Sequence, residues 1–118
     1  MTITRTDTSQ RLSQLVVHGN TIYIAGQVAL QNRGKSIPDQ SSEILQSIDK
    51  YLAAAGSDKS HMLSATIWLS DMNDYNAFNT IWDAWVPQGA APARACVEAN
   101  LAAPDFNVEV AVIAAVKE

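Results

Sequence analysis

One segment of the chain repeats its apolar side chains at the spacing of an α-helix. Between residues 44 and 55 they recur every three or four positions, which lines up Ile44, Leu45, Ile48, Tyr51, Leu52 and Ala55. This spacing predicts an amphipathic helix with one stripe that must pack against an apolar surface. Gly56 stands where a left-handed C-cap belongs, and the polar, turn-rich stretch from Asn32 to Pro38 predicts a loop before the helix.

A second helix is predicted after residue 71. Its apolar stripe consists of Tyr75, Phe78, Trp82, Trp85 and Val86. Asp71 or Asn73 can cap its first turn, and Pro87 with Gly89 ends it.

The remaining patterned segments have the period of two that is typical of β-strands. Residues 15–17 and 21–25 are short β-type runs separated by His18-Gly19-Asn20, which predicts a hairpin, and Gly26 follows where another backbone can approach. In residues 62–70, Leu63, Ala65, Ile67 and Leu69 are expected on one face, and Ser64, Thr66, Trp68 and Ser70 on the other. Residues 93–99 and 107–116 complete the set.

The order is therefore two or three strands, a helix, a strand, a helix and two strands, which indicates an α+β fold. Two amphipathic helices can cover one face of a single sheet. The other face also carries apolar residues such as Trp68 and Ile113, so it needs a partner, and the simplest partner is another copy of the chain.

Length and composition narrow the class of protein. The 118 residues suit one domain, 1–118, and 47% hydrophobic residues are enough for a core. A formal charge of −4 with scattered basic residues argues against nucleic-acid binding, and no apolar run is long enough for a membrane helix. The single cysteine and the polar N-terminus favour a cytoplasmic location. No P-loop, dinucleotide fingerprint or metal-ligand spacing is present, so neither a cofactor nor a metal is expected.

The segment Ala91-Pro-Ala-Arg-Ala-Cys-Val-Glu98 carries the most chemical information. In a strand, Arg94, Cys96 and Glu98 share a face, whereas Ala93, Ala95 and Val97 are suited to a tight core. A buried arginine needs a partner. That partner is either Glu98 or Glu109, in an internal ion pair, or the carboxylate of a ligand gripped by the guanidinium fork.

Three further polar side chains are candidates, each with a plainer alternative. Glu109 lies in a strand of Val and Ala, where partial burial would raise its pKa and suit it to proton transfer; an exposed edge position or an ion pair with Arg94 is the alternative. Cys96 is a nucleophile or simply a packed residue. Asn79 is a pocket residue or an ordinary surface asparagine of the second helix.

These segments resemble the Rid (YjgF) family of reactive intermediate deaminases, also labelled "endoribonuclease L-PSP". The resemblance spans about residues 11–116, and Trp82-Asp-Ala-Trp-Val86 is similar to the YoaB-type branch. The matching segments are Gly19-Asn-Thr-Ile-Tyr-Ile-Ala-Gly-Gln27, Ala54-Ala-Gly56, Asp71-Met-Asn-Asp-Tyr75, Ala91 to Glu98, and Val108-Glu-Val110. The resemblance implies a chorismate-mutase-like fold, with a mixed six-stranded sheet, two helices on one face, and a homotrimer whose ligand clefts lie between subunits.

The resemblance also implies the site. Arg94 matches the family's carboxylate-binding arginine and Glu109 its water-holding glutamate, and both are expected to be catalytic. Cys96, Gly26 and Asn79 match pocket-lining positions. Two pocket positions depart from the pattern: Leu12 stands where founding deaminases have a tyrosine, and Ala25 stands where a serine is common.

The activity implied is hydrolysis of 2-imino acids or their enamines to 2-keto acids and ammonia, without metal or cofactor. A binding or regulatory protein for 2-keto acids is the main alternative, favoured by the loss of the cleft tyrosine. An oxidation-activated holdase is a third hypothesis. A ribonuclease is the weakest, because the chain is acidic and has no histidine pair.

Overall fold

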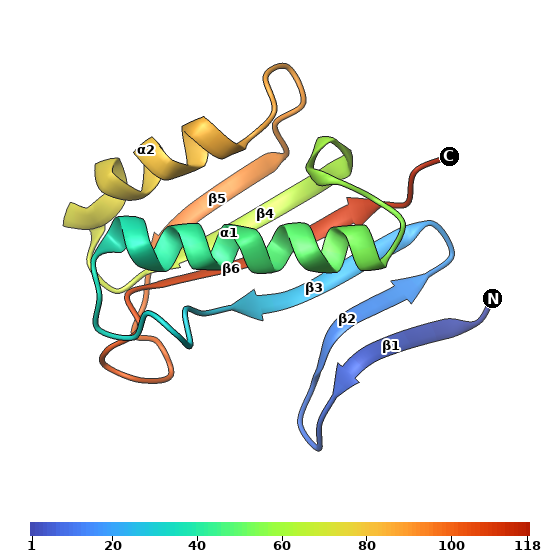
Figure 1. Ribbon diagram of the computed structural model, residues 1–118, viewed down its shortest axis with the longest axis horizontal. Coiled ribbons are helices and arrows are strands. Elements are labelled where there is room, and N and C mark those ends of the chain that lie inside the picture. The colour runs from blue at the N-terminus through green and yellow to red at the C-terminus, as the bar shows by residue number, and fades with distance from the viewer.

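The computed structural model describes residues 1–118 and contains one mixed sheet backed by two helices (Figure 1). The sheet order is β1-β2-β3-β6-β4-β5; only β4 and β5 are parallel, and every other neighbouring pair is antiparallel. The α+β class and the six-stranded sheet are confirmed. The elements are β1 (Ile3–Thr8), β2 (Ser13–His18), β3 (Thr21–Gln27), α1 (Ile37–Ala54), β4 (Met62–Leu69), α2 (Tyr75–Trp85), β5 (Ala93–Glu98) and β6 (Val108–Ala115), with 3₁₀ turns at Lys59–His61 and Met72–Asp74.

Helix α1 begins earlier than the sequence pattern predicts. The N-terminal cap is Ser36, whose hydroxyl accepts a hydrogen bond from the Asp39 amide. Pro38 then lies in the first turn, where its missing N–H has no intrahelical partner to lose. The prediction that the loop continues to Pro38 is therefore wrong. Gly56 has a φ of +77°, which confirms the left-handed position after the helix.

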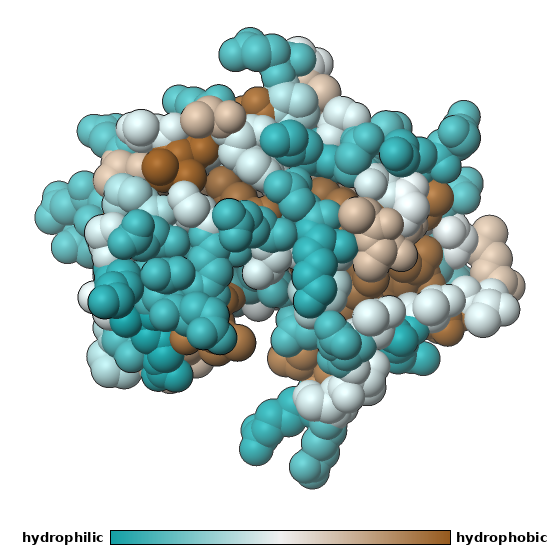
Figure 2. Space-filling model, in the orientation of Figure 1, coloured by the Kyte–Doolittle hydropathy of each residue, from teal (hydrophilic) through white to brown (hydrophobic).

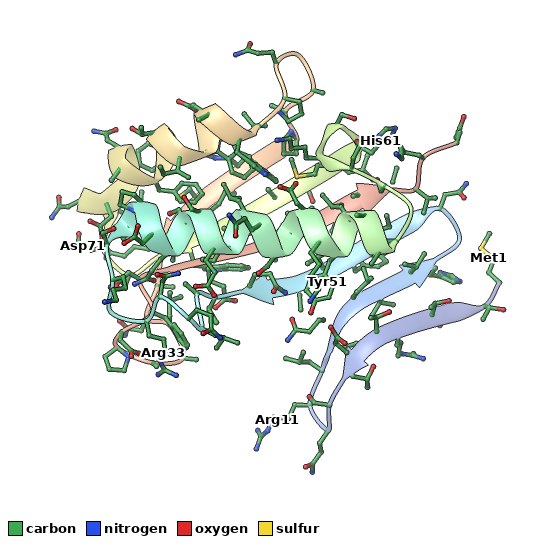
Figure 3. The ribbon with its side chains drawn as sticks, viewed as in Figure 1. Met1, Arg11, Arg33, Tyr51, His61 and Asp71 are labelled. Atoms are coloured by element: carbon green, nitrogen blue, oxygen red, sulfur yellow. The ribbon has the colours of Figure 1, made fainter.

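Helix α2 is preceded by a short turn that changes the role of the capping residues. Asp71 accepts a hydrogen bond from the Asn73 amide and so caps the 3₁₀ turn, and α2 itself begins only at Tyr75 (Figure 3). Phe78 and Trp82 are buried as predicted. Tyr75 is 39% exposed, so its predicted place in the buried stripe is wrong.

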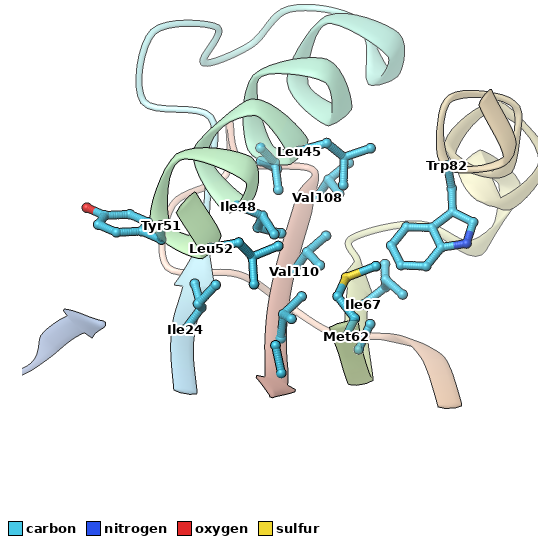
Figure 4. Packing of buried hydrophobic residues seen from close by; sticks show 14 of the residues in the cluster. Ile24, Leu45, Ile48, Tyr51, Leu52, Met62, Ile67, Trp82, Val108 and Val110 are labelled. Atoms are coloured by element: carbon cyan, nitrogen blue, oxygen red, sulfur yellow. The ribbon is translucent and has the colours of Figure 1, made fainter. Parts of the chain in front are cut away.

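The core lies between α1, α2 and the central strands of the sheet (Figure 4). Ile48 and Leu52 of α1 pack over β3 and β6, and the Trp82 ring closes the side near α2. Each such aliphatic side chain contributes about 1.5–3 kcal/mol when fully buried. Leu63 was expected on this face but is 52% exposed, because the pairing of β4 with β6 shifts register between Met62 and Ser64.

Strand β1 forms one edge of the sheet, and the sequence pattern did not single it out. Its residues alternate little and are mostly exposed. It is held by its ladder with β2 and by the Tyr51 hydroxyl of α1, which donates a 2.7 Å hydrogen bond to Oδ2 of Asp7. Burial, reinforced by this carboxylate, raises the pKa of Tyr51.

The sheet face opposite the helices is uncovered in a single chain. Tyr23, Val97 and Ile113 are all more than one third exposed on it. Ala93 and Ala95 are exposed beside Val97, so the prediction that these three residues fill a tight core is wrong for one chain. Neither helix has the length and apolar character needed to cross a membrane.

Candidate active site

Arg94 lies on the edge strand β5 with its side chain toward the helices. It pairs in register with the buried Ala65 of β4, which places both side chains on the helix-covered face. Its Nη2 atom donates a 2.8 Å hydrogen bond to Oδ1 of Asn79 and lies 3.5 Å from the hydroxyl of Tyr75. Arg94, Asn79 and Tyr75 are called the arginine cluster below.

Three aromatic rings of α2 surround the guanidinium carbon of Arg94. Their centroids lie 5.3 Å away for Trp82, 5.8 Å for Tyr75 and 5.9 Å for Phe78. All are within the range in which a cation is attracted to an aromatic ring. These rings restrict the guanidinium, and the Tyr75 hydroxyl is the only acceptor that they offer to its hydrogen bonds.

No carboxylate of the chain neutralises Arg94. The ion pairs of the chain are Arg33–Asp105, His61–Asp58 and Lys117–Asp58. The Glu98 carboxylate instead accepts a 2.9 Å hydrogen bond from the backbone amide of Met72. An internal ion pair of Arg94 with Glu98 or Glu109 is therefore wrong. A guanidinium has five donors, and those of Nε and Nη1 have no partner in the chain, so they can bind an anion.

Cys96 follows Arg94 on the same face of β5 and packs against the core. Burial raises the pKa of its thiol, an effect that the nearby charge of Arg94 opposes more weakly. A thiol of raised pKa is mostly protonated at neutral pH and is a poor nucleophile. The structure thus favours the packed interpretation of Cys96 over the nucleophilic one.

Glu109 lies on the opposite face of the sheet. It pairs with Trp68 of β4, and its carboxyl group lies directly over Gly26 of β3, where a Cβ atom would be only 2.8 Å from its Cδ. The absence of a side chain at position 26 therefore makes room for this carboxylate. Burial raises the pKa of Glu109 above the ordinary value of about 4.5. Glu109 and Gly26 are called the glutamate cluster below.

The structure brings the expected site residues together as two groups rather than one. Arg94 is in register with the helix-facing Ala65, whereas Glu109 is in register with Trp68, three positions further along the same strand. An odd separation along a strand puts side chains on opposite faces. Within one chain, Arg94 and Glu109 therefore cannot contact the same small molecule.

The two positions that depart from the family pattern lie near the N-terminal half of the sheet. Ala25 directly precedes Gly26 on β3 and is half-buried. Leu12 lies in the turn between β1 and β2 and is 47% exposed. Figure 2 shows the surface hollowed between this turn and the loop that carries Arg33.

Tyr75 is the site residue that sequence reasoning missed. Its aromatic side chain fits the apolar period of α2, and the pattern therefore assigned it to the core. Its position at the start of the helix could have indicated an exposed hydroxyl, because a polar tip can remain in solvent there while the ring packs.

A groove of about 330 Å³ lies elsewhere, between α1 and α2, where Figure 2 shows apolar surface. Its lining includes Leu45, Lys59, Ile81 and Trp85. None of the residues expected in the site belongs to it. No group of three or more His, Cys, Asp or Glu side chains is placed to hold a metal ion.

The fold and the two clusters define a class of protein. It is a small α+β protein whose edge strand carries an arginine without an ion-pair partner and whose central strand carries a half-buried glutamate. The chain belongs to the Endoribonuclease L-PSP family, whose pattern matches residues 2–116. The resemblance to the Rid (YjgF) family and its YoaB-type branch is thus confirmed.

Individual relatives agree with this assignment. The RutC family protein YoaB of Escherichia coli is 44% identical over 116 residues, covering 98% of this chain and 100% of the relative. A YjgF family member from Neisseria meningitidis has a crystal structure that matches with a TM-score of 0.96 at 42% identity, covering 100% of this chain and 98% of the other. A mouse protein named 2-iminobutanoate/2-iminopropanoate deaminase is 35% identical over 107 residues, covering 86% of this chain and 78% of the relative.

Proposed function

We propose that this protein hydrolyses 2-imino acids to 2-keto acids and ammonia, in a site that two copies of the chain build together. The observation that carries the proposal is the arginine cluster, which offers unpaired donors and no neutralising carboxylate. A carboxylate is the anion whose planar shape fits a guanidinium fork. The name of the mouse relative supports the same class of substrate.

Glu109 supplies the second requirement of this reaction, a group that accepts and returns a proton. Its ionised carboxylate takes a proton from water while the water oxygen bonds to the imine carbon, and it then gives that proton to the nitrogen, which yields the carbinolamine. The carboxylate next takes the proton of the carbinolamine hydroxyl and passes it to the amino group as the C–N bond breaks, so that ammonia leaves and the keto group forms. Burial raises the pKa of Glu109 toward neutral pH, and a pKa nearer to the working pH favours both taking up and returning a proton.

A second copy of the chain is needed to bring the two clusters together, because they lie on opposite faces of the sheet. The uncovered face carries exposed Tyr23, Val97 and Ile113, an apolar surface that another copy can cover. We infer a cyclic homotrimer, in which the arginine cluster of one subunit meets the glutamate cluster of its neighbour. The chain's net charge of −4 gives no support to RNA as the substrate.

The test of activity uses an amino acid oxidase to generate 2-imino acids in the presence of semicarbazide. The wild-type protein is expected to suppress semicarbazone formation, and Arg94→Ala is expected to lose that ability. Arg5→Ala is the matched control, because Arg5 is exposed on β1, at the opposite edge of the sheet from β5. If the wild type suppresses nothing across several side chains, the deaminase proposal fails, and binding of 2-keto acids becomes the better account.

Mixing two inactive variants tests the shared site. Arg94→Ala and Glu109→Gln subunits are unfolded together and refolded at equal amounts. In a random cyclic trimer, about one quarter of the sites join an intact Arg94 to an intact Glu109 from the neighbouring copy, so about one quarter of the wild-type activity returns. No recovery would mean that both residues must come from the same chain, which contradicts the proposed assembly.

A further inference from the structure

Tyr75 occupies a position that packing alone does not explain. It opens α2, and its hydroxyl lies 3.5 Å from Nη2 of Arg94 while its side chain is 39% exposed. The next aromatic residues of the helix, Phe78 and Trp82, are 0% and 4% exposed and fill the core. The phenol oxygen is thus held beside the guanidinium at the surface rather than buried under the helix.

The hydrogen-bond directions leave the Tyr75 hydroxyl free to donate. Nη2 of Arg94 is the donor toward both Tyr75 and Asn79, so the phenol oxygen and the Asn79 carbonyl oxygen act as acceptors. The phenolic hydrogen has no acceptor within the chain, and neither do the side-chain amide hydrogens of Asn79. The arginine cluster therefore presents donors from three side chains, and every one of them favours an anion.

We propose that Tyr75 is a substrate-binding residue whose hydroxyl donates a hydrogen bond to the carboxylate anchored by Arg94. The inference rests on the proposed function and adds a source of selectivity to it. Two oxygens of an ionised carboxylate can accept from the guanidinium and the phenol together. A neutral amide has only one acceptor oxygen, and its NH₂ group would face these donors, so the cluster discriminates against it.

The substitution Tyr75→Phe isolates this hydrogen bond, because it removes one oxygen and keeps the ring beside Arg94. The expected result is a five- to tenfold rise in the KM for a 2-imino acid, with kcat nearly unchanged. The Kd of the product analogue pyruvate, measured by calorimetric titration, rises by the same factor, whereas weak binding of pyruvamide changes little. Tyr51→Phe is the control: it removes a hydroxyl bonded to Asp7 in another part of the chain, and KM and Kd stay at wild-type values.

The outcomes separate this inference from the proposed function. If the wild type is active and Tyr75→Phe leaves KM and Kd unchanged at an unchanged melting temperature, Tyr75 does not bind substrate, and the deaminase proposal stands. If the wild type binds pyruvate without turning over any imine, the deaminase proposal fails, and the pyruvate Kd of Tyr75→Phe alone decides the inference. If the wild type binds no 2-keto acid, the inference is wrong.

Discussion

Gly26→Ala tests whether the position of the Glu109 carboxylate determines turnover. A Cβ atom at residue 26 would lie 2.8 Å from Cδ and 3.1 Å from Cγ of Glu109. Non-bonded carbon atoms prefer separations of about 3.5–4.0 Å, so the carboxyl group must move by about 0.7 Å or more. A misplacement of about 1 Å at a reacting group costs about a hundredfold in rate. We therefore expect kcat to fall by about that factor, close to the effect of Glu109→Gln.

The same substitution should hardly change stability. The atoms that must move belong to the end of a flexible side chain, and Gly26 does not have the positive φ found at four other glycines. An off-rotamer shift of Glu109 costs about 0.5–1.5 kcal/mol, and the gain from replacing glycine by alanine offsets about 0.4–1 kcal/mol of it. The melting temperature should therefore move by only a few degrees.

The assay compares kcat for wild type, Gly26→Ala, Glu109→Gln and the double variant in the semicarbazide assay, with thermal unfolding of each. If both changes act through one carboxylate, the double variant is no slower than Glu109→Gln. Retention of more than half of the wild-type kcat by Gly26→Ala would refute the reasoning. Independent, multiplying losses in the double variant would refute it as well.

Two further predictions concern stability. Burial raises the pKa of Glu109 in the folded state, so the folded chain holds a proton more tightly than the unfolded one. The free energy of unfolding of the wild type, measured by urea titration, should therefore fall relative to that of Glu109→Gln as pH rises from 4 to 7. A difference between the two proteins that changes in the opposite sense contradicts this. Gln40 is fully buried and forms 2.9 Å hydrogen bonds with both the backbone amide and the side chain of Asn107. Gln40→Leu should therefore lower the free energy of unfolding by about 3 kcal/mol, whereas Gln46→Leu, at an exposed position of the same helix, should change it by no more than about 0.5 kcal/mol. Equal effects of the two substitutions would refute the role of the buried network.

Local patterns were sufficient wherever one residue and its near neighbours decide the outcome. The stripe of α1 and the hairpin at Gly19 were predicted correctly, because periodicity and a positive φ are properties of a short segment. Two failures have causes that the hydrophobic pattern does not contain. The shift in register between β4 and β6, strands far apart in the chain, exposed Leu63, and a capped 3₁₀ turn delayed the start of α2 until Tyr75.

The sequence by itself determined which residues have the chemistry of the site. An arginine and a glutamate within strands of small apolar residues stand out because a charge there needs a partner. Only the tertiary structure decided that Arg94 and Glu109 are not partners of each other within one chain. Strand pairing sets the face on which each side chain lies, and that pairing joins residues far apart in the chain. It places Arg94 beside Asn79 and Tyr75, puts Glu109 over Gly26 on the other face, and so prevents one chain from pairing the two charges.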